Sequence, residues 1–159
     1  MTPTKTATIA LNAVDDILGF NLGAVFRQSA SQDGVLELVE VLNQPRMEKM
    51  YGGLPVFLRD APAGTHSTLA WEVFEAGGPG WVNDTAESER LPRKSPFGSL
   101  MIYPIGQHGV ILLAATRLEA FTETEELLLD LLAAALETAF DRLEREHDLR
   151  RQRDELQRQ

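Results

Sequence analysis

The sequence contains no cysteine, which excludes disulfide bonds, cysteine-ligated zinc and thiol catalysis. It also lacks any run of eighteen apolar residues, so no segment is expected to span a bilayer. The first five residues lack the basic and then apolar pattern of a secretory signal. Together these absences predict a soluble, cytoplasmic protein.

Basic residues are few: 15 Lys and Arg face 24 Asp and Glu, which gives a net charge of −9. A surface of this sign repels phosphate backbones, so we expect no direct nucleic-acid partner. The only lysines are Lys5, Lys49 and Lys94. Acidity with little lysine suits a salt-rich cytoplasm, but a GC-rich genome predicts the same arginine bias. Halophilic adaptation and codon bias are therefore alternatives.

An apolar share of 43% in 159 residues is enough for one domain with one core. Apolar residues at spacings of three and four predict a first helix over residues 6–18. Alternation on both sides of a turn at 31–34 predicts a β-hairpin from strands 21–29 and 35–42. The other expected elements are a short helix (45–51), an irregular stretch (54–58), a helix (65–76), a short strand (81–83), a polar loop (84–96) and two strands (97–105 and 110–115). The last strand is apolar throughout, which predicts a central place in the sheet.

The C-terminal helix begins with a capping box formed by Thr122 and Glu125. Apolar residues then recur at spacings of three and four, which is typical of a coiled-coil seam: Leu129, Leu132, Leu136, Ala139 and Leu143. Leu149 and Leu156 follow one residue out of register, which indicates a local overwinding of the coil. We therefore expect a domain over residues 1–143 and a helical coiled-coil extension over 144–159, leading toward an output domain.

This order of elements resembles the GAF domain. The resemblance is carried by residues 71–77 (WEVFEAG), 82–84 (VND), 103–110 (YPIGQHGV) and 115–121 (ATRLEAF). The likeness is to GAF modules of sensor histidine kinases and of bacterioopsin-activator-like regulators from salt-loving archaea. It implies an α+β, PAS/profilin-like fold. The central antiparallel sheet would have five or six strands, with the N- and C-terminal helices on one face and short helices and loops on the other.

The resemblance also implies which family chemistries to test. Bilin attachment and methionine sulfoxide reduction in this family need cysteines, which are absent. The cyclic-nucleotide motif corresponds here to Thr116-Arg117, Phe121 and Glu125-Glu126, of which only Phe121 matches outright, so helix capping and packing are favoured for these residues. Some members bind haem through one histidine, and His66 is the candidate here. The simpler alternative is that His66 caps the helix or lies on the surface.

Two further histidines, His108 in a turn expected to be exposed and His147 on a charged helix face, have no second histidine at metal-ligand spacing. The sequence also lacks a phosphate-binding loop and a nucleophile elbow. We therefore predict no metal site and no enzymatic activity, and the cofactor is unknown.

Two functions fit these patterns. The first is a sensor that binds a small ligand beneath the irregular middle segment, because methionine and aromatic side chains adapt to flat ligands. The candidate lining residues are Met47, Met50, Tyr51, Phe57, Trp71, Phe74, Trp81 and Tyr103. The competing hypothesis is that these side chains simply fill the core.

The second function is a ligand-free dimerisation module of a larger signalling or transcription-regulating protein, which a closed core would favour. In both cases we expect a homodimer paired through the terminal helices, whose imperfect seam allows two states. The candidate interface residues are Ala7, Leu11, Val14, Leu18, Leu129, Leu132, Leu136, Ala139 and Leu143.

Overall fold

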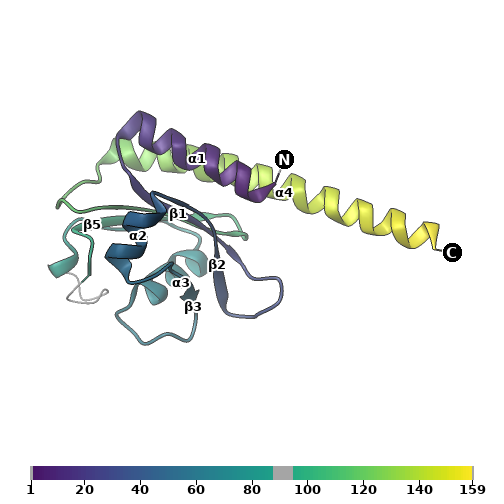
Figure 1. Ribbon diagram of the computed structural model, residues 1–159, viewed down its shortest axis with the longest axis horizontal. Coiled ribbons are helices and arrows are strands. Elements are labelled where there is room, and N and C mark those ends of the chain that lie inside the picture. The colour runs from purple at the N-terminus through teal and green to yellow at the C-terminus, as the bar shows by residue number, and fades with distance from the viewer. Residues whose placement is uncertain (1, 88–94, 159) are drawn as a thin grey trace.

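The computed structural model describes residues 2–87 and 95–158 as a curled antiparallel sheet between two layers of helices (Figure 1). The six strands lie in the order β3-β2-β1-β6-β5-β4. Their bounds are β1 (Leu22–Gln28), β2 (Val35–Leu42), β3 (Phe57–Leu58), β4 (Gly80–Val82), β5 (Ser99–Ile105) and β6 (Gly109–Ala115). The expected α+β class and antiparallel sheet are confirmed.

Helices α1 and α4 run side by side in opposite directions over one face of the sheet, and α2 and α3 cover the other face (Figure 1). Their bounds are α1 (Pro3–Leu18), α2 (Gln44–Tyr51), α3 (His66–Ala76) and α4 (Glu123–Gln157). The expected loop over 84–96 holds a 3-10 turn at Thr85–Glu87, and its residues 88–94 lie outside the described residues. No described helix is both long and apolar enough to cross a bilayer.

Local chemistry explains where the long helices begin and end. The hydroxyl of Thr2 accepts the backbone N–H of Lys5 at 3.2 Å and caps α1, which ends at Gly19 with φ of +74°. At the start of α4, the backbone N–H of Thr122 donates to the carboxylate of Glu125 at 2.9 Å. The expected capping box is therefore present.

Strand β6 lies between β1 and β5, and all seven of its residues are buried. Because side chains alternate along a strand, β6 contributes to two separate cores. Val110, Leu112 and Ala114 join the core under α2 and α3, whereas Ile111, Leu113 and Ala115 join the core under α1 and α4. This confirms the central position expected from its continuous apolar sequence.

Five of the nine residues expected to pair two subunits are buried inside one subunit. At most 1% of the surface of the following residues is exposed, because they pack on the sheet: Ala7, Leu11, Val14, Leu129 and Leu136. The remaining members, Leu18, Leu132, Ala139 and Leu143, are half-buried. The correction has a simple cause: an apolar sheet face needs a cover, and periodicity alone does not reveal what a helix faces.

Beyond the sheet, α4 continues as a free-standing helix that projects from the domain (Figure 1). Every described residue from 144 to 158 is exposed. The helix has 35 residues, which corresponds to a length of about 52 Å. Only its first half therefore packs on the sheet.

The β1–β6 pairing can be tested at Gly109, where an added Cβ would lie 1.8 Å from the carbonyl oxygen of Phe26. We expect Gly109→Ala to push the two strands apart and to lower the free energy of unfolding by about 3 kcal/mol. Gly78→Ala is the matched control, because a Cβ there meets nothing within 4 Å. Thermal unfolding followed by circular dichroism measures both, and equal melting temperatures would contradict the strand register.

Candidate functional site

The candidate ligand pocket lies between the sheet and the layer formed by α2, β3 and α3. The residues around it come from the sheet, from these elements and from the segment before β5: Ala24, Phe26, Met47, Tyr51, Pro55, Phe57, His66, Phe97 and Leu112. The space between their side chains is about 10 Å³, which is at the lower limit for one water molecule. This face of the sheet is therefore a closed core.

Aromatic rings close this space. The rings of Phe26 and Phe57 lie 4.3 Å apart between centroids. The imidazole of His66 lies between Tyr51 at 5.5 Å and Phe97 at 5.8 Å, also between centroids. Such ring contacts stabilise the packed state beyond the burial of area alone.

His66 is a core residue, because only 6% of its surface is exposed. The residue that caps α3 is its neighbour Thr65. Its Nε2 lies 3.0 Å from the Oγ of Ser95, so the buried ring has a polar partner. Burial lowers the pKa of His66 below its ordinary value of 6.5. The closed space around it leaves no room for haem.

Trp71 is likewise part of the core. Its Nε1 donates to the carbonyl oxygen of Phe57 at 3.0 Å, and the guanidinium of Arg59 lies 4.5 Å from its ring centroid. Phe74 meets the same indole edge-on at 5.4 Å. Met47, Phe57 and Trp71 are at most 2% exposed, so these three predicted lining residues fill the space that they were expected to surround.

Two predicted lining residues lie on the other face of the sheet. Trp81 on β4 pairs with Met101 on β5, and Met101 belongs to the core under α1 and α4. Tyr103, two residues further along β5, points to that same side, where its hydroxyl donates to Asp130 of α4 at 2.7 Å. Burial, this hydrogen bond and the charges of Asp130 and Glu126 raise the pKa of Tyr103 to about 12. The remaining two candidates, Met50 and Tyr51, are half-buried against the closed core.

A second cluster joins the sheet to α4 and involves His108, which was expected to be exposed but is 8% exposed. In the turn between β5 and β6, its Nε2 lies 2.6 Å from an oxygen of Asp141, and its Nδ1 lies 3.4 Å from an oxygen of Glu144. The imidazole also meets the buried ring of Phe140 edge-on, at 5.6 Å between centroids. No local sequence pattern predicts this contact, because 33 residues separate His108 from Asp141.

A family model described as a GAF domain matches residues 1–141. The chain belongs to the GAF family. A domain assigned to a two-component sensor histidine kinase of Sinorhizobium meliloti 1021 is similar in structure, with a TM-score of 0.71 and 15% identity over 94% of this chain and 98% of that one. A methyl-accepting chemotaxis protein is similar with a TM-score of 0.68 and 15% identity over 89% of this chain and 90% of that one.

The free methionine-R-sulfoxide reductase of Neisseria meningitidis is also similar, with a TM-score of 0.67 and 17% identity over 88% of this chain and 78% of that one. Identities this low show the fold alone. No curated protein matches the sequence. The likeness to archaeal bacterioopsin-activator-like regulators stays an expectation.

Family membership limits the chemistry without deciding it. GAF domains are generally regulatory and occur in signalling proteins, although the Neisseria protein is an enzyme. This chain has no cysteine, so its GAF fold offers no thiol nucleophile. In the described part of the chain, no group of three or more potential metal ligands comes together.

The two tryptophans provide a test of the closed core. Trp71→Phe leaves the carbonyl of Phe57 without its buried donor, and we expect it to lower the free energy of unfolding by about 2 kcal/mol. Trp81 is 41% exposed, so Trp81→Phe should change that free energy by less than about 0.5 kcal/mol. Denaturant unfolding measures both, and a neutral Trp71→Phe variant would contradict the assignment.

His66 predicts a pH dependence of stability. Because burial lowers its pKa in the folded state, the unfolded chain binds a proton more readily. Its contribution is therefore complete above pH 6.5 and is lost as the pH falls through the lower folded-state pKa. We expect His66→Gln to reduce the loss of stability between about pH 7.5 and about pH 5. His147→Gln on the exposed helix is the control; equal acid destabilisation of both variants contradicts the prediction.

Proposed function

We propose that this chain is a regulatory GAF domain that acts as a parallel homodimer, in which paired α4 helices carry the state of the domain to a following output segment. The supporting observation is a line of leucines along α4 that faces away from the sheet. These residues, which we call the outer stripe, are 60–72% exposed: Leu127, Leu131, Leu149 and Leu156.

The outer stripe is straight. At 100° per residue, its four leucines lie within about 40° of one another around the helix axis. They lie opposite the residues of α4 that pack on the sheet: Leu129, Ala133, Leu136 and Phe140. Leu149 and Leu156 therefore continue the line of Leu127 and Leu131, and the apparent slip in register is a change of face that needs no overwinding of the helix.

Helix α1 also carries exposed apolar side chains. Ile9 and Ile17 on α1 are 59% and 66% exposed, and α1 runs beside α4. Exposed apolar side chains that gather on one surface mark interaction sites. A second copy offers the same surface in return under two-fold symmetry, so it is a self-complementary partner.

The charges of the projecting helix favour parallel pairing in one register. With Leu149 and Leu156 at heptad position a, Asp148 is at g and lies opposite the partner's Arg153 at e, which is an attractive pair. With the same leucines at d, Arg145 would lie opposite the partner's Arg150. Within residues 145–158, repulsion between like charges therefore favours the first register, although further back along α4 that register sets Asp141 at g opposite the partner's Glu146 at e.

The closed core supports the ligand-free form of this function. A ligand sensor is the second candidate, and the observation that favours it is that α2 fully buries one side chain, Met47, while Met50 and Tyr51 are half-buried. So small an apolar contact makes α2 the part of the cover that is easiest to displace. Native mass spectrometry of the purified protein separates the two candidates, since a small molecule that co-purifies supports the sensor.

The absence of natural cysteines allows the parallel dimer to be tested with single-cysteine variants. We expect Leu131→Cys and Leu149→Cys each to form a disulfide between chains under mild oxidation. Identical residues meet at two such separated positions only when the helices run in parallel. The rate is measured by non-reducing electrophoresis.

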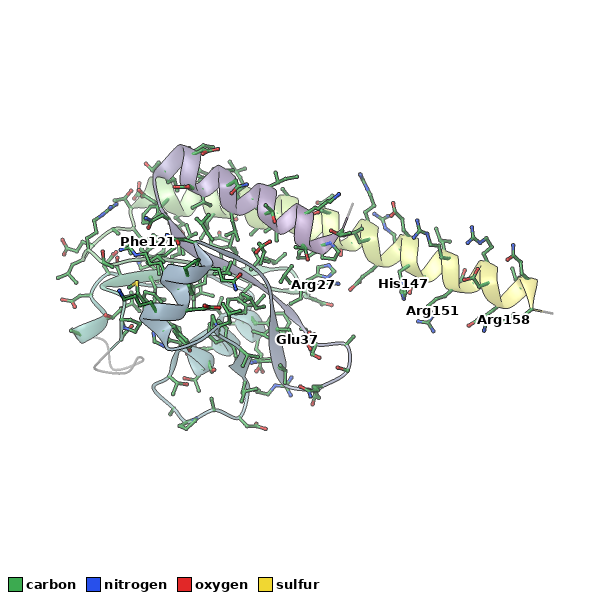
Figure 2. All side chains as sticks on the ribbon, in the orientation of Figure 1. Arg27, Glu37, Phe121, His147, Arg151 and Arg158 are labelled. Atoms are coloured by element: carbon green, nitrogen blue, oxygen red, sulfur yellow. The ribbon has the colours of Figure 1, made fainter. Side chains whose placement is uncertain are left out.

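Arg151→Cys is the matched control, because Arg151 is also exposed on the projecting part of α4 (Figure 2) and lies about 160° from Leu149 around the helix axis. It should cross-link several-fold more slowly. Similar rates for Leu149→Cys and Arg151→Cys, or a monomer by light scattering at micromolar concentration, would contradict the proposal.

A further inference from the structure

The segment where α4 leaves the domain, residues 140–146, is fixed to the sheet on its inner side; we call it the neck. Phe140 is fully buried, and the guanidinium of Arg27 lies 5.1 Å from its ring centroid. Figure 2 labels Arg27 at the end of the sheet from which the helix departs. His108 contacts the neck through Asp141 at 2.6 Å and Glu144 at 3.4 Å.

On its outer side, the neck carries two arginines where the outer stripe has no leucine. In the register of the proposed dimer, Arg142 is at position a and Arg145 at position d, so each faces its own copy across the pair. These like charges repel unless carboxylates at neighbouring positions compensate them. The partner's Asp141 at g borders Arg142, and the partner's Glu146 at e borders Arg145. At these four positions the charges of each helix cancel only if both carboxylates are available, and Glu144 at c lies outside this contact.

Asp141 therefore has two possible partners. Its side chain is 56% exposed although one oxygen is bound by His108 of the same chain. We propose that Asp141 is a switch residue, which binds either its own His108 or the partner's Arg142, and that binding to His108 loosens the dimer at the neck. This inference rests on the proposed parallel dimer and adds the means by which the sheet controls the helix pair.

The position of His108 explains how the domain would set this choice. Its carbonyl oxygen accepts the backbone N–H of Gln28 at 2.7 Å, so the turn is tied to β1 as well as to β5 and β6. These strands line both cores, so they connect the packing under α2 and α3 to the imidazole. The other charged groups at the neck are Glu144, which shares the imidazole, and Arg27 over Phe140.

The test compares variants that break the same contact from its two ends, each in a Leu149→Cys background, with the rate of disulfide formation as the readout. His108→Ala frees Asp141 for the partner's Arg142, so we expect cross-linking to become about fivefold faster. Asp141→Asn also breaks the contact, but it removes the compensating charge, so cross-linking should become slower. A merely structural clasp predicts the same direction for both variants.

Two controls complete the design. Glu144→Gln removes the second partner of His108 and leaves Asp141 in place, so it should change the rate by less than about twofold. Replacing both arginines (Arg142→Leu with Arg145→Leu) removes the need for compensation, and in that background His108→Ala and Asp141→Asn should have no effect. Thermal unfolding confirms that each variant is folded.

The outcomes separate this inference from the proposed function. Opposite effects of His108→Ala and Asp141→Asn that vanish without the arginines support the switch. Effects in the same direction, or effects that persist without the arginines, overturn it while the dimer stands. If Leu149→Cys itself does not cross-link, the parallel dimer is overturned and the switch with it.

Discussion

The packing of the rest of the molecule depends on the two apolar sides of α4. One side is covered within the chain, where Leu129, Ala133, Leu136 and Phe140 pack on the sheet and bury its face. The other side exposes Leu127 and Leu131 over the sheet and Leu149 and Leu156 on the projecting part. The projecting segment, residues 144–158, is exposed and highly charged, and an isolated helix of such a length is marginal in water unless its apolar side is packed. A second copy is the smallest addition that covers the outer stripe from end to end.

The core on the opposite face of the sheet is closed, so it offers no preformed space for a ligand. His66, Trp71 and Met47 fill the space in which a ligand would bind, and their polar atoms have partners inside the chain. Changes in the packing of this face can still reach α4, because β6 contributes side chains to both cores. The turn that carries His108 is the point where the sheet and the neck meet.

Local patterns predicted the elements but not what they face. The capping box at Thr122 and the continuous apolar run of β6 are signals within a few residues, so the helix start and the central strand followed from the sequence. Both apolar stripes of α4 have helical spacing, so spacing could not tell which one lies on the sheet. Tyr103 was assigned to the wrong face because β5 is apolar on both sides. The His108 contact joins segments 33 residues apart, and no local pattern reports it.

Hydrogen exchange of the backbone amides of residues 144–157 tests the central claim most directly. Beyond Glu144, whose carboxylate contacts His108, every described residue of this segment is exposed, so packing against a second copy would slow exchange beyond the protection that the helix alone gives. We predict slow exchange at concentrations where the chain is dimeric and a return to fast exchange on dilution. Exchange as fast as in an unstructured peptide at every concentration would contradict the account.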